Sequence, residues 1–146
     1  MKSTGYDCVI QLLQTATVLW RESRRLFRPF GLTEAQFNVL HLLAQTTEGM
    51  SQRKLSDLLV VDRSDVTLLL DRMEGRRWVV RRDDPGDRRA YRVQLTGSGR
   101  SMWRKVHPSY TRAVERIMQG IPSRQVKAAI EILRMIDSQA TRWRME

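Results

Sequence analysis

The residues whose side chains are best suited to binding chemistry lie between positions 62 and 76, where short polar side chains alternate with arginines. Apolar residues recur there at i, i+3, i+4 and i+7 from Val66, which predicts an amphipathic helix with one buried stripe. The opposite face would present hydroxyl and carboxylate groups that can reach base edges in a major groove, and guanidinium groups that can pair with phosphates. The residues of this helix expected to contact DNA are Arg63, Ser64, Asp65, Thr67, Leu68, Arg72 and Arg76.

Leu68 is an apolar residue on the face that is expected to be exposed. Contact with a thymine methyl group would account for it, although single exposed leucines are common on protein surfaces. The helix alone therefore does not separate DNA recognition from an ordinary solvated face. The segment that follows it favours the first interpretation.

An arginine-rich hairpin is predicted directly after this helix. Residues 78–83 and 90–96 are β-branched and aromatic runs of strand length, and the sequence from Asp83 to Asp87 is typical of a turn. Arginines at the tip of such a hairpin fit a narrow minor groove, which concentrates negative potential. Taken alone, a solvated turn of mixed charge is the simpler interpretation. The residues of this wing (81–92) that we expect at the DNA are Arg82, Asp87, Arg88 and Arg89.

Other chemistries have little support in the residue types. The chain shows no nucleophile–histidine–acid set, no carboxylate pair, no phosphate-binding glycine loop and no metal-ligand spacing, so we expect no enzyme activity, metal or cofactor. The aspartates of the turn, which stand beside arginines, are typical of ion-paired turn residues. An RNA-binding module is the remaining alternative, but such proteins stack bases on exposed aromatic residues of a sheet, and only Trp78 and Tyr91 lie on the hairpin.

The elements that must position this helix and wing can be predicted from capping and periodicity. Thr33, with Gln36 three residues later, forms a capping box that opens a helix. After a loop at 46–50, Ser51 is expected to cap a short helix over 52–59, and Asp62 to cap the helix that reaches Arg76. The leucines that the short helix is expected to bury are Leu55, Leu58 and Leu59.

Long helices with apolar seams are predicted at both ends of the chain. One spans residues 7–30, one spans 98–119 with Pro108 expected to kink or split it near His107, and the last begins at Pro122. The seams step by three and four residues in a heptad-like pattern. The first seam comprises Val9, Leu12, Ala16, Leu19, Ser23, Leu26 and Phe30, and the last comprises Val126, Ala129, Leu133, Ile136, Ala140 and Trp143. Because the central lobe is small, we expect the seams to pack on each other and on a second copy; packing within one chain is the alternative.

Composition sets wider limits. A chain of 146 residues with 41% hydrophobic residues fits one domain with an ordinary core. The net charge of +10 suits a polyanionic partner, although only four of the 26 basic residues are lysine, so a GC-rich genome could account for part of the arginine excess. No apolar run is long enough for a membrane span, and the N-terminal sequence does not resemble a signal peptide, so we expect a cytoplasmic protein.

Three segments taken in order carry a family resemblance. Residues 32–40 (LTEAQFNVL), 61–74 (VDRSDVTLLLDRME) and 79–99 (VVRRDDPGDRRAYRVQLTGSG) resemble successive signatures of the MarR family of bacterial regulators. The resemblance implies a mainly α fold with a small β-hairpin wing. In that fold a winged helix-turn-helix lobe (32–97) is flanked by dimerisation helices (1–31 and 98–146). It also implies a homodimer that binds a pseudo-palindromic double-stranded DNA operator and regulates transcription, here as a ligand-responsive repressor.

The resemblance also assigns roles to single residues. It places Ser64, Asp65 and Thr67 at the bases and Arg89 in the minor groove, and it pairs Asp87 with Arg72; the residues alone also allow Asp87 to pair with Arg89. Two positions depart from the family pattern. Many members have Gly at the position of Arg77, where a left-handed helix cap suits glycine, so the helix end is expected to be shifted or strained. The residue after Thr67 is commonly polar in the family, whereas here it is Leu68.

Members of the family often release DNA when a small aromatic or anionic effector binds between the dimer helices and the DNA-binding lobe. The candidate lining residues share aromatic, imidazole or guanidinium side chains, and an aromatic core is an equally good interpretation of them. They are Trp20, Arg24, Phe27, Phe37, His41, Trp103, His107 and Tyr110. Cys8 lies roughly where peroxide-sensing members keep a reactive cysteine, but its neighbours Tyr6 and Asp7 include no base, so an inert thiol is the alternative.

Overall fold

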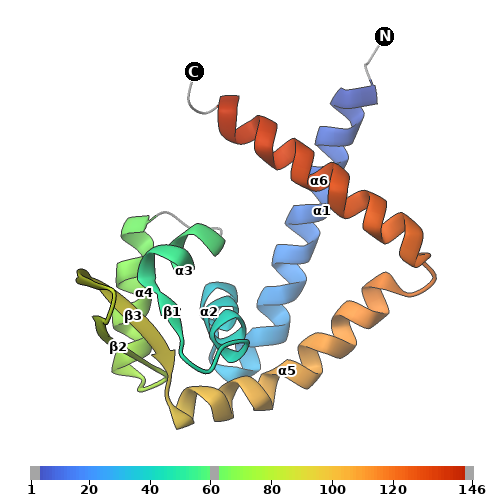
Figure 1. Cartoon of the computed structure of the whole chain (residues 1–146). Helices are drawn as coiled ribbons and strands as arrows, with labels where there is room; N and C mark the ends of the chain where they lie inside the picture. Colours follow the sequence, from blue (N-terminus) through green and yellow to red (C-terminus); the bar gives the residue numbers. More distant parts are fainter. Residues whose placement is uncertain (1–3, 60–62, 144–146) are drawn as a thin grey trace. The chain divides into compact units, whose positions relative to one another are not determined.

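The computed structural model describes residues 4–59 and 63–143, and it leaves the side chains of Arg63 and Ser64 outside the description. Contacts divide the chain into two compact units, residues 1–110 and 111–146. The boundary lies inside one long helix, α5 (Gly97–Met118). The first unit contains every element expected to touch DNA (Figure 1).

The first helix, α1 (Thr4–Phe27), continues into one turn of 3-10 helix, η1 (Arg28–Phe30). We predicted a single helix over 7–30, and the final three residues differ because Pro29 cannot donate a backbone hydrogen bond. Gly31 closes the turn at φ 68°, with its N–H donating to the carbonyl of Arg28 at 3.0 Å.

Three helices follow: α2 (Glu34–Ala44), α3 (Gln52–Leu58) and α4 (Arg63–Gly75). The predicted capping box of Thr33 and Gln36 is confirmed, and the Ser51 hydroxyl accepts the N–H of Lys54 at the start of α3. The predicted cap at Asp62 lies outside the described residues.

The predicted burial of Leu58 is wrong, because its side chain is 51% exposed. Helix α3 ends at Leu58, and Leu59 takes up an extended backbone conformation with ψ 143°. That change of direction turns Leu59 into the core beside Leu55 and leaves Leu58 on the surface.

The predicted hairpin is present as β2 (Val79–Asp84) and β3 (Asp87–Leu95), and a further strand, β1 (Met50–Ser51), pairs with the outer edge of β3. The antiparallel order is β1-β3-β2, with Met50 and Arg81 both opposite Val93. The sequence predicts a loop that includes residue 50, and this differs from the structure because a strand of two residues is too short to show a period. Gly49, at φ 74°, is required here since a Cβ would collide with the Val93 carbonyl.

The end of α4 is formed by a Schellman motif. Trp78 N–H donates to the carbonyl of Met73 at 3.0 Å, and Arg77 N–H donates to that of Glu74 at 2.8 Å. Arg77 has φ 61°, a left-handed backbone conformation that is less favourable by about 1–2 kcal/mol for an L-amino acid other than glycine. The predicted strain at this junction is therefore present, while the helix end is not shifted.

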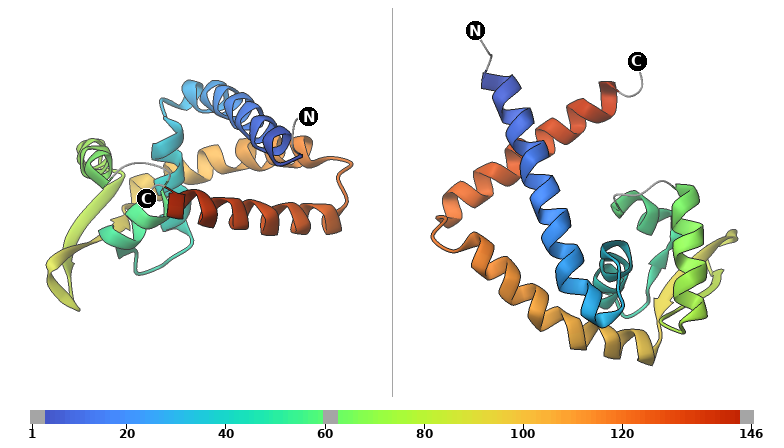
Figure 2. Two further views of the ribbon diagram at one scale, coloured as in Figure 1. Left: turned by 90° about the horizontal axis from the view of Figure 1, so that it is seen from above. Right: turned by 180° about the vertical axis from the view of Figure 1, so that it is seen from behind.

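The core of the first unit lies between α2, α4, the sheet and the first turns of α5, and Figures 1 and 2 show α4 lying alongside the hairpin. Its buried apolar side chains are Phe27, Leu32, Phe37, Val39, Leu40, Leu43, Met50, Leu55, Leu59, Val66, Leu70, Met73, Trp78, Val79, Val93 and Val106. Because buried residues of α4 and of both hairpin strands share this core, the helix and the wing are packed as one body.

Helix α5 begins as predicted, with the Thr96 hydroxyl accepting the N–H of Gly99 at 2.9 Å. We predicted a kink or a split near His107; the split is wrong, since α5 is one continuous helix with Pro108 inside it, and the kink stays a prediction. Pro108 removes one backbone hydrogen bond from α5. The helix continues because Val106 is buried in the core, and the rings of Trp103 and Tyr110, before and after it in the chain, pack against the core.

The last helix, α6 (Ser123–Trp143), belongs to the second unit and begins one residue after Pro122. Large apolar side chains are exposed on α6, among them Ile132, Leu133, Met135 and Trp143. Within residues 4–59 and 63–143, the helices are too short or too polar to cross a membrane.

Candidate nucleic-acid interface

The exposed face of α4 carries the polar groups expected at base edges. Asp65, Thr67, Leu68 and Arg72 are all exposed, with Leu68 at 50%. Val66, Leu70 and Met73 on the opposite side are fully buried, and Leu69 lies half-buried at the edge of the stripe. Residues 63 and 64 form the first turn of the helix, and the positions of their side chains are outside the described part.

Helix α3 contributes to the same surface, which sequence reasoning missed. The side-chain amide of Gln52 donates to the hydroxyl of Thr67 at 3.3 Å, joining the two helices. Beside this contact lies a hollow lined by Gln52, Arg53, Ser56 and Thr67. The signal that could have found these residues is the order of elements, because in a helix-turn-helix the helix before the recognition helix crosses the DNA backbone.

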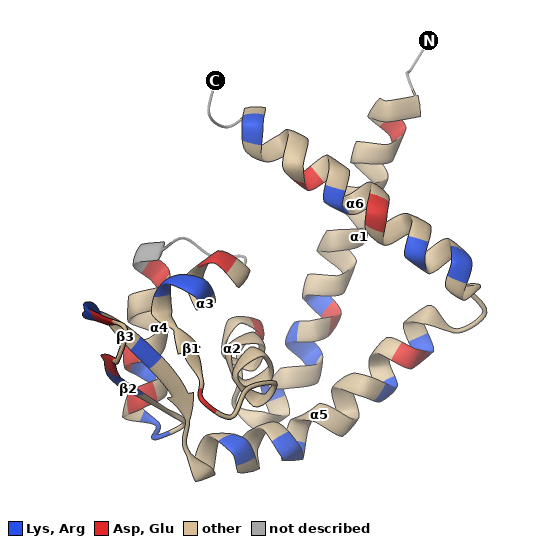
Figure 3. Cartoon of the chain, in the orientation of Figure 1, with Lys and Arg blue, Asp and Glu red and all other residues tan. Residues whose placement is uncertain are grey.

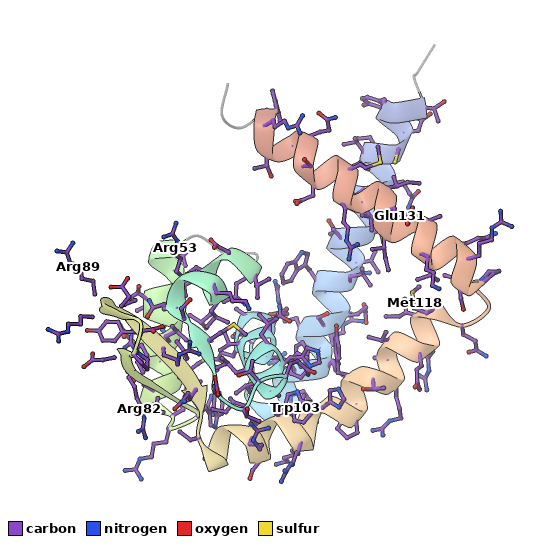
Figure 4. All side chains as sticks on the ribbon, viewed as in Figure 1. Arg53, Arg82, Arg89, Trp103, Met118 and Glu131 are labelled. Atoms are coloured by element: carbon purple, nitrogen blue, oxygen red, sulfur yellow. The ribbon has the colours of Figure 1, made fainter. Side chains whose placement is uncertain are left out.

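The wing presents Arg82, Arg88 and Arg89 as exposed side chains. Figure 4 shows Arg89 at the hairpin tip and Arg53 on α3 projecting outward from the first unit. Asp87 does not pair with Arg72 in the described structure. Its carboxylate accepts the backbone N–H of Arg89 at 2.9 Å, so that it organises the hairpin turn instead.

The wing is fastened to α4 by Arg81. Its backbone N–H donates to Glu74 Oε1 at 2.9 Å, and its Nε and Nη2 donate to Glu74 Oε2 at 3.2 and 2.8 Å. Nη2 also contacts the carboxylate of Asp71. The Arg81 side chain is only 17% exposed. These contacts set the direction of β2 relative to the exposed face of α4.

The charges of this cluster stabilise one another. The hydrogen bond from the Arg81 side chain lowers the pKa of Glu74, an effect that exceeds the opposing effect of burial. The hydrogen bond to Glu74 in turn raises the pKa of Arg81. Figure 3 shows basic and acidic residues interleaved on α4 and the hairpin. The sequence predicts ion pairs between the wing arginines and the aspartates of the turn, whereas Arg81 pairs with two acids of α4. The overlooked signal was the spacing of those acids at i and i+3 on the preceding helix.

Arg76, which we had expected at a phosphate, has partners inside the first unit. Its Nη1 donates to the carbonyl of Gly31 at 2.8 Å, and its guanidinium lies 4.1 Å from the centre of the Trp78 ring. It therefore ties the end of α4 to the turn after η1.

Most of the candidate effector residues meet in one aromatic stack. Phe27 and Phe37 stack at 4.5 Å between centroids, Phe37 and Tyr110 lie 4.8 Å apart, and Trp103 and His107 lie 4.5 Å apart. Figure 4 labels Trp103, which stands on α5 near α2.

His41 lies within this stack, 5.6 Å from His107 between ring centroids. The indole N–H of Trp103 donates to His41 Nδ1 at 3.3 Å, which requires a neutral Nδ1. Burial, followed by the nearby His107, lowers the pKa of His41.

Three candidates stand apart from the stack. Trp20 is 45% exposed, and Arg24 Nε lies 3.5 Å from Glu34 Oε1. Cys8 is an exposed free thiol on α1.

A three-helix lobe with a polar recognition face and an arginine-tipped hairpin fixed to it defines the winged helix-turn-helix class of protein. The MarR family model matches residues 30–90 of the chain. The chain is 38% identical over 95 residues to the transcriptional activatory protein BadR of Rhodopseudomonas palustris, a match that covers 64% of this chain and 54%, about half, of that protein.

Solved structures extend the similarity over nearly the whole chain. CouR from Rhodococcus jostii RHA1 bound to p-coumaroyl-CoA is 27% identical, with a TM-score of 0.82 over 93% of this chain and 95% of that one. The repressor CouR bound to a 23-mer DNA duplex is 28% identical, with a TM-score of 0.75 over 92% of each chain. The match to the MarR family model and the shared fold confirm the resemblance to MarR transcriptional regulators and the fold predicted from the sequence.

Proposed function

We propose that this protein binds double-stranded DNA as a homodimer, with α4 of each protomer in a major groove and the wing (81–92) at the adjacent minor groove. The observation that carries the proposal is the joint placement of two surfaces: the exposed polar face of α4 and an arginine-tipped hairpin that Arg81 fastens to it. A fixed angle between them allows both to meet one duplex at once.

The type of each side chain determines which part of the DNA it contacts in this proposal. Asp65 and Thr67 are short enough to hydrogen-bond base edges, and Leu68 suits a thymine methyl group. Arg72 is exposed and can meet phosphates. Arg89 at the tip suits the negative potential of a narrow minor groove.

The homodimer is supported by apolar surface that a single protomer leaves in water. Val9 and Leu19 of α1, and Ile132, Leu133 and Met135 of α6, are all exposed. Removing apolar surface from water contributes about 25 cal/mol per Å², so helices of this kind favour association. Two protomers related by a two-fold axis would read two half-sites of a pseudo-palindromic operator.

We further propose that an effector regulates DNA binding, and that the protein acts as a ligand-responsive repressor. The structural neighbour CouR was solved with p-coumaroyl-CoA and is named a repressor. In this chain the half-buried rings of His41, Trp103, His107 and Tyr110, which pack around the buried Phe37, offer an aromatic surface to a small aromatic or anionic molecule. A reporter gene placed behind the operator tests the direction of control; higher expression in the presence of the protein would contradict repression.

Arg89→Ala tests the DNA-binding proposal. We expect a loss of about 1–3 kcal/mol in operator affinity with an unchanged fold and dimer, whereas Arg104→Ala, which removes an exposed arginine of α5, should change affinity little. Wild-type affinity should fall by about 10³ or more between 50 and 200 mM salt if roughly six or more phosphates are neutralised. Equal affinities for the two variants, or binding unaffected by salt, would contradict the proposal.

A further inference from the structure

In the hydrogen bond that joins α3 to α4, Gln52 is the donor and Thr67 is the acceptor, and this assignment affects how Thr67 can recognise a base. Gln52 is half-buried, and its Nε2 donates to Oγ1 of Thr67, which stands exposed on the recognition face. A threonine hydroxyl has one hydrogen to donate and two lone pairs to accept with. Since one lone pair of Thr67 receives the amide hydrogen, the hydroxyl hydrogen is directed away from Gln52.

The orientation of the Gln52 amide follows from its surroundings. Its Oε1 is buried and has no hydrogen-bond partner in the part of the chain that the structure describes. Turning the amide over would bury an NH₂ group with two unsatisfied hydrogens in place of that one oxygen. A buried unsatisfied donor is costly, so the orientation that donates to Thr67 is favoured.

We propose that Gln52 is a specificity-determining positioning residue, which makes the Thr67 hydroxyl a hydrogen-bond donor toward the major groove. A donor at this point selects bases that present an acceptor there: guanine through O6 and N7, or thymine through O4, over cytosine, which presents only its N4 amino group. This inference rests on the proposed function, because it names how one position of the operator is read.

The test selects duplexes from a randomised pool with the purified full-length chain and compares wild type with variants. Thr67→Val removes the hydroxyl and identifies the operator position that faces it. Gln52→Leu should relax the preference for guanine or thymine over cytosine at that position by roughly threefold to tenfold, the value of one net hydrogen bond. Gln45→Leu is the matched control, because its Nε2 also makes a 3.3 Å hydrogen bond, to the carbonyl of His41 at the end of α2.

Gln52→Glu gives the sharper outcome. A carboxylate only accepts, so Thr67 must donate to it and present a lone pair to the groove, which should turn the preference toward adenine or cytosine at that position alone. This variant keeps a polar side chain and carries the test if Gln52→Leu fails to fold. In a Thr67→Val background, Gln52→Glu should leave base preference unchanged.

Uniform loss of affinity at all sequences, with no change of preference at the Thr67 position in either Gln52 variant, would overturn the inference. Failure of the wild-type chain to select any sequence would instead overturn the proposed function. The two failures are therefore distinguishable in one experiment.

Discussion

Replacing Glu74 with alanine should loosen the wing from the recognition helix. In the folded protein Glu74 accepts three hydrogen bonds from Arg81, one from its backbone and two from its guanidinium. A neutral hydrogen bond contributes about 0.5–1.5 kcal/mol and a charged one about 1.5–3 kcal/mol. The simple sum is too large, because the guanidinium bonds share one oxygen, Glu74 is 34% exposed and solvent screens such pairs. We therefore expect a loss of about 2–3 kcal/mol.

Urea unfolding at equal protomer concentration measures this loss, because the stability of a dimer depends on concentration. Glu48→Ala is the matched control, because its side chain is exposed and its backbone carbonyl, which the substitution keeps, accepts hydrogen bonds from Arg92 and Gln94. The control should change stability by less than about 0.5 kcal/mol. If both variants unfold at the same urea concentration, the Arg81 contacts do not fasten the wing.

The pH dependence of this effect has a defined sign. Because the pKa of Glu74 is lowered in the folded protein, its contribution is fully present above the ordinary value of 4.5 and is lost as the pH falls below it. The stability difference between wild type and Glu74→Gln should therefore shrink below about pH 4.5. A difference that stays constant down to pH 3 would contradict the coupling.

Two other changes test separate parts of the structure. Arg77→Gly should raise stability by about 1 kcal/mol, seen as a higher urea midpoint, because glycine relieves the left-handed conformation at φ 61°, whereas Arg77→Ala should bring no gain. Equal effects of the two would contradict strain at that junction. For His41 the pKa is lowered on folding, so stability should be full above about pH 6.5 and decrease as the pH falls below it. His41→Gln should remove that decrease in a pH series of thermal unfolding, and an unchanged profile would show that His41 is not its source.

The helices and the hairpin could be predicted from the sequence because their signals are local. Capping by Thr33 and Ser51, the buried stripe that begins at Val66 and the turn before Asp87 each act over a few residues. Periodicity could not reveal β1, since two residues show no period and their pairing with Val93 is set by the fold.

The contacts that organise the candidate site depend on distant parts of the chain and were less visible. Arg76 meets a carbonyl 45 positions earlier, and Gln52 meets Thr67 across 15 positions. All the wing arginines look alike in the sequence, and only the fold shows that Arg81 turns inward to Glu74 while Arg89 stays exposed.

A hydroxyl-radical footprint of the full-length chain on its selected operator tests the central claim most directly. Two copies of α4 in successive major grooves predict two protected half-sites with centres about 34–36 Å, or roughly one helical turn, apart. Each should be flanked by minor-groove protection that disappears in Arg89→Ala. A single protected half-site, or protection spread evenly along the duplex, would contradict the account.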